Sequence, residues 1–356
     1  MLPYIIIFLF PVWIGIIQYR GDDLKNSKHT LFWMIFFIVL FMFYAFRYKI
    51  GFDYLGYCNY INTGLYEIYT YDHGRREYLS YILMHLAHMC GNPQLYFASV
   101  AAISLPLFYL TFKRYSDTHK EMMMAIILFL AIPVGLLYSF TASRQFPALA
   151  ILFYATRFLL ERKFIPYAVC VLLAMCFHTS AIVGMLFYFI ASPRVKVKWC
   201  LVIGIAITLV IQLLKEFIAK MLPMFEHYFY MTYDPQNGGL SQVVLYFLIG
   251  CILLYSYPYV NSRLKEYESW LKCYWLGLIF CLMFVFTDPV TGIRGGMIGL
   301  TYTFLCIPRV MAVIEKNKYG KMIYGTVVFI TFSVYMYGLI NAGAKYIPYQ
   351  YRLFWG

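Results

Sequence analysis

Residues 31–46 read LFWMIFFIVLFMFYAF, without a single charge, and Arg47 follows at once in RYKIGFDY. A run of this kind approaches the ~17–25 apolar residues that a transmembrane helix needs. The whole chain has the same character: of its 356 residues, 62% are hydrophobic and 13% are charged, and the mean hydropathy is +0.68. This balance excludes a soluble domain of this size and predicts an all-α, polytopic integral membrane protein.

Short polar breaks separate further apolar runs and predict about 11–12 transmembrane helices in a single transmembrane domain, residues 1–356. The expected spans are residues 2–18, 31–46, 94–112, 122–140, 145–160, 164–177, 180–192, 199–221, 242–257, 271–287, 296–310 and 322–340. The short pair 164–177 and 180–192 predicts either two half-length helices that meet at His178 or one long tilted helix. Residues 78–92 are shorter still and predict an amphipathic or re-entrant helix.

The positions of lysine and arginine predict the orientation, because cytoplasmic loops carry an excess of both. Six segments hold most of the 29 basic residues and are assigned to the cytoplasm: 19–30, 113–121, 157–163, 193–198, 258–272 and 309–321. The loop 47–77 then faces outward, although Arg75 and Arg76 oppose that assignment weakly. The net charge of +13 therefore reflects cytoplasmic loops, and no segment is suited to binding nucleic acid.

Several kinds of site are not supported by the sequence. The nine cysteines form no CxxC pair and lie mainly in apolar segments, which favours buried free thiols over zinc ligands or disulfides. The sixteen acids contain no DxD-like pair for a magnesium-dependent nucleotide-sugar site. The sequence also lacks a P-loop, a nucleophile elbow and an HExxH motif. We therefore expect no bound metal and no cofactor.

Four arginines end hydrophobic segments on the predicted outer face, where basic residues should be scarce: Arg47, Arg144, Arg294 and Arg352. A guanidinium can bind a diphosphate through bidentate hydrogen bonds, or it can extend to lipid headgroups. Arg144 stands where a helix starts, a place that already favours phosphate. The glycines around Arg294 fit either a helix-packing face or a binding site.

Two further residues stand out because polar groups are costly in a membrane. His178 lies in the apolar stretch LLAMCFHTSAIVGML, as a base, a phosphate ligand or a hydrogen-bonded core residue. Asp53 follows Gly51 in a stretch whose tyrosines suit either a site or the aromatic belt at the membrane interface.

The order of these motifs resembles the EpsG/Wzy-type family of bacterial polysaccharide polymerases. The family pattern is an arginine before G-x-D-Y-x-x-Y, then S-R-Q before a small apolar helix, then F-H-x-S-A. The matching residues are Arg47, Gly51, Asp53, Tyr54 and Tyr57, then Ser143, Arg144 and Gln145, then Phe177, His178, Ser180 and Ala181. The match covers roughly residues 47–185, and the second half of the chain agrees in hydropathy and in its late arginine.

The resemblance implies a GT-C-like membrane glycosyltransferase of the bacterial inner (cytoplasmic) membrane, with its active site facing the periplasm. Such an enzyme moves a growing glycan from undecaprenyl diphosphate onto the non-reducing end of a lipid-linked repeat unit, without a metal. The implied partners are the lipid-linked oligosaccharide donor and acceptor, membrane lipids and a chain-length regulator protein, with no nucleic acid.

In that reaction each candidate residue has an expected role. The diphosphate is expected to contact Arg47, Arg144, Arg294 and Gln145. The candidates for the catalytic base are His178, Asp53 and Glu77, and the sequence leaves the choice among them open. Weaker candidates for contact with sugar are Tyr54, Tyr57 and Arg352.

Three other functions remain as alternatives. The short loop 222–241 argues against an O-antigen ligase, and the order of the motifs argues against a membrane acyltransferase. A flippase or transporter of lipid-linked glycan would need arginines near the middle of the membrane and accessible from both sides, whereas these arginines lie at one boundary.

Overall fold

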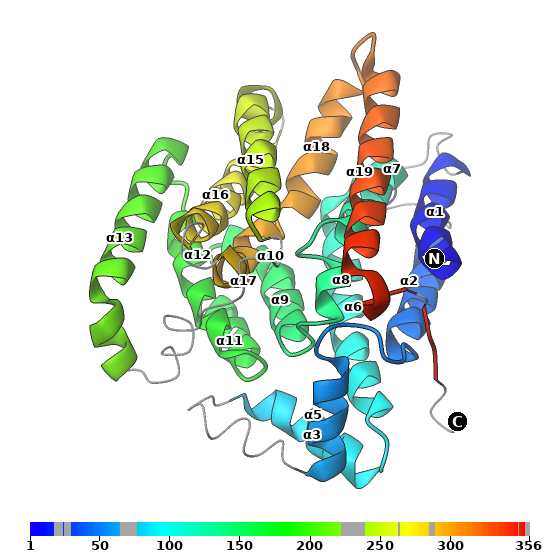
Figure 1. Cartoon of the computed structure of the whole chain (residues 1–356). Coiled ribbons are helices and arrows are strands. Elements are labelled where there is room, and N and C mark those ends of the chain that lie inside the picture. Colours follow the sequence, from blue (N-terminus) through cyan, green and yellow to red (C-terminus); the bar gives the residue numbers. More distant parts are fainter. Residues whose placement is uncertain are drawn as a thin grey trace. The chain divides into compact units, whose positions relative to one another are not determined.

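A computed structural model describes residues 1–17, 24, 30–64, 77–221, 239–262, 264–284, 289–347 and 349–352. Within these residues the structure is helical, with no strand and a single isolated bridge between Arg47 and Tyr351 (Figure 1). This confirms the all-α membrane class. The contacts divide the chain into unit 1 (Met1–Tyr66, Leu79–Ala150, Ile307–Gly356) and unit 2 (Glu67–Tyr78, Ile151–Cys306). The expected single domain stays a prediction.

The helices of unit 1 are α1 (Leu2–Ile17), α2 (Thr30–Ala45), α3 (Tyr54–Thr63), α5 (Tyr78–Met89, beginning one residue before the unit), α6 (Gln94–Tyr115), α7 (His119–Ala131), α8 (Leu136–Ser139), α19 (Gly320–Ala342) and the 3₁₀ turn η4 (Gly343–Lys345). Those of unit 2 are α10 (Thr156–Leu160), α11 (Phe164–Met175), the 3₁₀ helix η1 (Thr179–Val183), α12 (Gly184–Ile190), α13 (Val197–Met221), α15 (Gly239–Asn261), α16 (Glu266–Phe284) and α17 (Pro289–Leu300). Besides α5, two helices contain a unit boundary within their sequence: α9 (Gln145–Tyr154) and α18 (Thr303–Ile314).

Unit 1 has α7 at its core, packed against α1, α6, α8 and α19. Thr118 caps its first turn by accepting a hydrogen bond from the backbone N–H of Glu121 at 3.2 Å. The helix ends at Ala131, before Pro133, and a Cβ at Gly135 would collide with the carbonyl oxygen of Phe129. This tight turn breaks the expected span 122–140 into α7 and α8.

Unit 2 has α16 at its core, packed against α12, α13, α15 and α17. Its side chains are buried from Trp270 to Cys281. The buried Lys272 is held by the carbonyl oxygens of Ser192 and Val195, each 2.8 Å from its Nζ. The carbonyls at the end of one segment therefore satisfy a charge that would otherwise be costly to bury.

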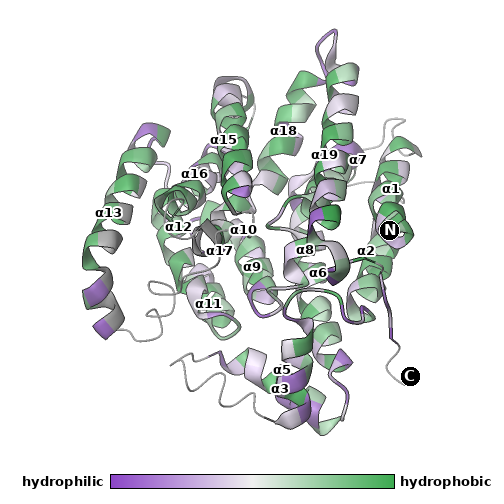
Figure 2. Ribbon diagram, in the orientation of Figure 1, coloured by the Kyte–Doolittle hydropathy of each residue, from purple (hydrophilic) through white to green (hydrophobic). Residues whose placement is uncertain are grey.

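The helices consist mostly of hydrophobic residues (Figure 2). Many large hydrophobic side chains are exposed, as expected for surfaces that contact lipid. Large hydrophobic side chains on α2 and α19 are widely exposed, for example Ile38 (59%) and Phe329 (68%). Soluble proteins rarely expose contiguous surfaces of this kind. The connection between α18 and α19 is hydrophilic instead (Figure 2).

Three described helices are long and apolar enough to cross a membrane: Gln94–Tyr115, Leu240–Asn261 and Gly320–Lys345. The pair Gly292–Leu300 and Thr303–Ile314, bent by 48°, gives a fourth span if it is counted as one. The other apolar helices found by this criterion have 10–17 residues. Hydrophobic runs that suggested full spans are thus often divided, because polar or proline-containing turns interrupt them.

Two local expectations are confirmed. Residues 164–177 and 180–192 form short separate helices, α11 and then η1 with α12, and His178 lies at their junction. Residues 78–92 contain α5, whose exposed apolar side chains at Tyr78, Ile82, Leu86 and Met89 form one helical stripe. Its placement in a membrane stays a prediction.

Candidate functional site

Arg47 in unit 1 is buried and surrounded by acceptors. The residue follows α2, and its exposure is 0%. Its Nε donates to the carbonyl oxygen of Ile50 at 3.3 Å and its Nη1 to that of Tyr44 at 3.3 Å. Its Nη2 donates to the carbonyl oxygen of Phe140 at 3.4 Å and to Oγ of Ser143 at 3.0 Å.

Aromatic rings enclose the same guanidinium. Its Cζ lies 4.0 Å from the ring centre of Tyr44, 4.4 Å from that of Phe97 and 5.0 Å from that of Phe140. Cation–π attraction of this kind strengthens when the charge is removed from water. These contacts show that Arg47 holds segments of unit 1 together, and its expected contact with the diphosphate stays a prediction.

Gln94, the first residue of α6, completes this cluster and was not among the residues that the sequence suggested. Its Nε2 donates to the carbonyl oxygens of Ala45 and Arg47, the latter at 2.8 Å. Its Oε1 accepts a hydrogen bond from the hydroxyl of Tyr54 at 2.9 Å. The only sequence signal is the preceding Asn92, whose side chain accepts from the backbone N–H of Gln94 at 3.0 Å, as in a helix cap.

Gly51 fixes the turn between Arg47 and α3. Its φ of +104° is a conformation that suits glycine, and a Cβ at this position would collide with the carbonyl oxygen of Phe140. Asp53 follows as the N-cap residue of α3, with an exposed side chain that forms no capping hydrogen bond. The structure therefore keeps Asp53 at the surface of unit 1.

A segment late in the sequence closes this turn from the other side. The backbone N–H of Gly51 donates to the carbonyl oxygen of Lys345 at 2.9 Å, and that of Tyr48 donates to the carbonyl oxygen of Gln350 at 2.8 Å. The backbone N–H of Arg352 donates to the carbonyl oxygen of Phe46 at 2.8 Å. The side chain of Arg352 is exposed, and its Cζ lies 5.7 Å from the ring centre of Tyr48.

Arg144 is another candidate arginine of unit 1 and lies in the turn before α9. It is 7% exposed, and its Nε donates to the hydroxyl of Tyr57 at 3.3 Å. The ring of Tyr57 is buried against Tyr96 and Phe97. A hydrogen bond to Nε holds the guanidinium in one plane.

The two tyrosines expected to contact sugar have other positions. Tyr54 is 3% exposed and stacks on Phe97 with the ring centres 4.7 Å apart, while Tyr57 is 7% exposed. Both rings pack in the interior of unit 1, and the expected contact with sugar stays a prediction. Burial raises the pKa of the Tyr54 hydroxyl and also the pKa of the neighbouring Cys58 thiol, so neither is a ready anionic nucleophile. Gln145, the first residue of α9, is buried beside Arg144 in sequence.

Unit 2 brings together two residues that the sequence offered as separate candidates. Nδ1 of His178 lies 3.1 Å from Oε1 of Glu77. The same oxygen accepts a hydrogen bond from the backbone N–H of Thr179 at 3.1 Å, and Oγ1 of Thr179 is 3.5 Å away. Glu77 is 1% exposed and His178 is 9% exposed.

The local backbone explains how His178 reaches this position. It leaves α11 in an extended conformation (φ −153°, ψ 120°), after which η1 begins. A carboxylate at Nδ1 places the ring proton on that nitrogen, so Nε2 carries the basic lone pair. Glu77 and His178 therefore have the geometry of a histidine base oriented by a carboxylate.

Arg294 lies on α17, which packs against η1 within unit 2. The glycines around it divide into two groups. A Cβ at Gly296 or Gly299 would collide with α16, whereas a Cβ at Gly295 would meet nothing within 4 Å. The face that includes Gly296 is therefore a helix-packing face, and Arg294, which is partly exposed, lies outside it.

In the parts of the chain that the structure describes, no three His, Cys, Asp or Glu side chains are grouped so that they could hold a metal ion. The expected absence of a metal remains a prediction.

The fold and these side chains define an all-helical, polytopic membrane protein that contains a carboxylate–histidine pair, a buried arginine (Arg144) and a partly exposed one (Arg294). The chain belongs to the EpsG family, whose family model matches residues 30–351. No curated protein and no solved structure matches it. Membership of the family supports a polysaccharide-polymerase type of function and a glycosyltransferase-like activity.

Proposed function

We propose that this chain is a membrane polysaccharide polymerase of the bacterial inner membrane, with its reaction on the periplasmic face. It transfers a growing glycan from undecaprenyl diphosphate onto the non-reducing end of a lipid-linked repeat unit. Family membership supports the polymerase class. The observation that carries the chemistry is the 3.1 Å contact between His178 and Glu77.

In the proposed step, a hydroxyl oxygen of the acceptor sugar attacks the anomeric carbon of the donor glycan. The bond between that carbon and the diphosphate oxygen breaks, and undecaprenyl diphosphate leaves with the bonding electrons. Nε2 of His178 accepts the hydroxyl proton. Glu77, bonded to Nδ1, orients the ring and stabilises the imidazolium that forms.

The diphosphate leaving group develops negative charge, which arginines stabilise without a metal if their donors are already oriented. Arg144 is proposed for this role because Tyr57 fixes its Nε at 3.3 Å. Arg294 is proposed because its helix packs against η1, which begins next to His178. Gln145 remains a secondary candidate for contact with the diphosphate.

Other residues have lesser roles in this proposal. Arg47 is proposed chiefly to position the turn of unit 1, and its contact with the diphosphate stays a secondary proposal. Asp53 is second to His178 as a base, because its side chain is exposed, whereas His178 is buried and lies 3.1 Å from Glu77. Arg352 stays a weak candidate for contact with sugar. A chain-length regulator and membrane lipids remain proposed partners.

The test is complementation of a strain that lacks this gene, followed by a gel of its lipid-linked and surface polysaccharide. Wild type and a His85→Asn control, which changes an exposed histidine of α5, should restore a ladder. His178→Asn should leave a single lipid-linked repeat unit at normal protein levels, with activity lowered by about 10²–10⁴-fold.

Two outcomes would count against the proposal. A full ladder from His178→Asn would remove His178 from the chemistry. A ladder that survives deletion of the gene, or a repeat unit that never reaches the outer face, would remove the polymerase function and favour a ligase or a transporter.

A further inference from the structure

Ser180 belongs to the matched motif F-H-x-S-A, but the proposed reaction gives it no role. It is the second residue of η1 and lies two positions after His178. Its side chain is 9% exposed, and its hydroxyl forms no hydrogen bond with any described residue. The hydroxyl oxygen is not fully enclosed, so a molecule outside the chain can reach it.

The backbone before Ser180 explains why its hydroxyl has no partner in the described chain. Serines on helices commonly donate to a carbonyl oxygen one turn earlier. In unit 2, Oγ of Ser256 donates in this way to the carbonyl oxygen of Ile252 at 2.8 Å. No helical turn precedes Ser180, because the chain is extended at His178 (φ −153°, ψ 120°).

Hydrogen bonds on both sides fix the position of Ser180. The backbone N–H of Thr179 donates to Oε1 of Glu77 at 3.1 Å, and that of Ala181 donates to the carbonyl oxygen of His178 at 3.0 Å. Two residues span at most about 7 Å of chain. A sugar whose hydroxyl reaches the ring of His178 can therefore also reach the hydroxyl of Ser180.

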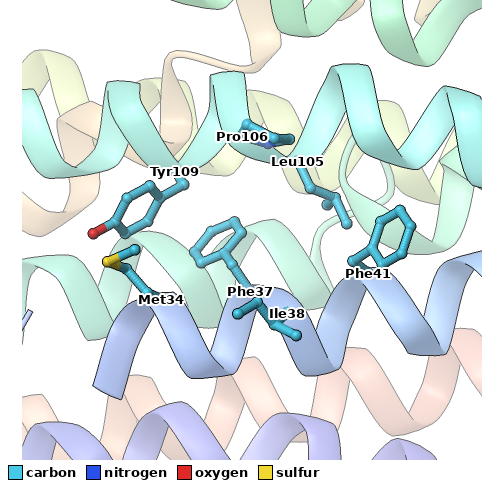
Figure 3. A pocket seen from close by; sticks show the side chains of 7 residues that line it. All are labelled: Met34, Phe37, Ile38, Phe41, Leu105, Pro106 and Tyr109. Atoms are coloured by element: carbon cyan, nitrogen blue, oxygen red, sulfur yellow. The ribbon is translucent and has the colours of Figure 1, made fainter. Parts of the chain in front are cut away.

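The apolar groove between α2 and α6 of unit 1 is a surface of the opposite kind. Apolar side chains such as Phe37 and Leu105 line it, together with the ring of Tyr109 (Figure 3). The hydroxyl oxygen of Tyr109 is itself buried. This groove therefore offers a sugar no hydrogen bond, whereas Ser180 offers an accessible hydroxyl beside the candidate base.

The chemistry of the group limits what it would bind. A mostly buried hydroxyl without a partner is unfavourable, so the partner of Ser180 comes from outside the described chain. A serine hydroxyl both donates and accepts hydrogen bonds, as the hydroxyls of a sugar do. A diphosphate only accepts them, and a guanidinium binds it more strongly.

We propose that the hydroxyl of Ser180 forms a hydrogen bond with a second, non-reacting hydroxyl of the acceptor sugar whose reacting hydroxyl gives its proton to His178. Ser180 is then a substrate-binding residue that helps to select the acceptor. This inference rests on the proposed polymerase function.

The experiment compares Ser180→Ala with wild type in membrane vesicles, at rising concentrations of the lipid-linked repeat unit purified from the deletion strain. Ser180→Ala should raise the KM for the repeat unit about threefold to tenfold and change kcat little, because one neutral hydrogen bond to the bound sugar is lost. The pH dependence of kcat should stay as in wild type, since the hydroxyl bonds to neither Glu77 nor His178.

Ser256→Ala is the matched control, because Ser256 lies in the same unit and is also 9% exposed, but its hydroxyl bonds to its own helix. It should leave the KM unchanged. Both variants should melt close to the wild-type temperature.

The possible failures are distinguishable. An unchanged KM in Ser180→Ala would overturn the inference and leave the polymerase function intact. A shifted pH profile would show that Ser180 acts through His178, and a lowered melting temperature would show a structural role; either would also overturn it. Failure of the wild-type protein to elongate the repeat unit would overturn the polymerase function and this inference together.

Discussion

Arg47 in unit 1 and Glu77 in unit 2 are both ionisable residues with almost no exposure, yet the surrounding structure treats them differently. Arg47 donates to four oxygens of its own chain and is covered by three aromatic rings. Glu77 is bonded to Thr179 and to a histidine that can itself gain or lose a proton. Burial alone therefore does not distinguish a structural charge from a chemical one.

The distinguishing property is the partner. Carbonyl oxygens and aromatic rings do not titrate near neutral pH, so a guanidinium surrounded mainly by them stabilises the fold and takes no proton from it. A carboxylate bonded to an imidazole can respond to a proton arriving from substrate. The comparison predicts that loss of Arg47 destroys structure, whereas loss of the Glu77 charge destroys activity and spares structure.

The largest expected effect is that of Arg47→Ala. The change leaves several buried carbonyl oxygens without donors, which should lower the free energy of unfolding by roughly 3–5 kcal/mol. Fluorescence-detected size-exclusion chromatography after heating measures the loss. Arg352→Ala, an exposed arginine of the same unit, is the control and should stay within about 0.5 kcal/mol of wild type. An Arg47→Ala protein as stable as wild type would contradict the structural role of Arg47.

Glu77→Gln tests the chemical side. The amide keeps an oxygen that can accept from Thr179, but it loses the charge that stabilises a protonated His178. Polymerisation should fall about 100-fold or more, while the melting temperature changes little. Glu268→Gln is the control, because this acid of the same unit contacts Lys272 at 3.5 Å and has no proposed role in catalysis. Loss of folded Glu77→Gln protein would make Glu77 another structural charge, like Arg47.

Two adjacent glycines sharpen the comparison for the helix that carries Arg294. A Cβ at Gly296 would lie 2.6 Å from Sγ of Cys281 and would also press on the carbonyl oxygen of Gly277, whereas Gly295 faces open space. Gly296→Ala should therefore lower the free energy of unfolding by about 1–3 kcal/mol. Gly295→Ala should be neutral or raise it by about 0.5–1 kcal/mol through helix propensity. Thermal melting of the two variants gives the answer, and equal melting temperatures would contradict the assigned packing face.

The smallest effect is expected from Tyr57→Phe, which removes one acceptor from Arg144 and keeps the ring. Activity should fall about threefold to tenfold, because one hydrogen bond that orients the guanidinium is lost. Tyr337→Phe, on the exposed face of α19, serves as the matched control. Rates measured in membrane vesicles distinguish the two. Unchanged activity in Tyr57→Phe would show that the hydrogen bond from Arg144 to Tyr57 does not contribute to the reaction.

The sequence was a good guide to helices and to the types of residue in the site. Apolar runs located most helices, and the split at His178 followed from two runs too short to span a membrane. Glu77 and His178 were both candidates, but their contact joins residues about a hundred positions apart, and no local pattern encodes such a pairing.

Other features depend on tertiary contacts that a sequence does not display. The structural contacts of Arg47 could not be predicted in full, because two of its four acceptors, Phe140 and Ser143, lie 93 and 96 residues further along the chain. Gln94 gave almost no signal, since a glutamine at the start of a helix is ordinary. The burial of Tyr54 and Tyr57 could not be predicted either, because aromatic residues at a membrane boundary suit either the interfacial belt or a core.

The turn around Gly51 has a consequence for the order in which the protein is made. The partners of this turn are synthesised very late. Tyr349, whose hydroxyl donates to the carbonyl oxygen of Phe43, lies 306 residues after Phe43 in the chain. Translation at about 5–20 residues per second delivers that partner about 15–60 s after the turn has been synthesised. Ribosome-arrested chains that stop before Lys345 should therefore be cut by protease near Tyr48, whereas chains released after Arg352 should resist. Equal resistance of both would show that the turn closes without its late partner.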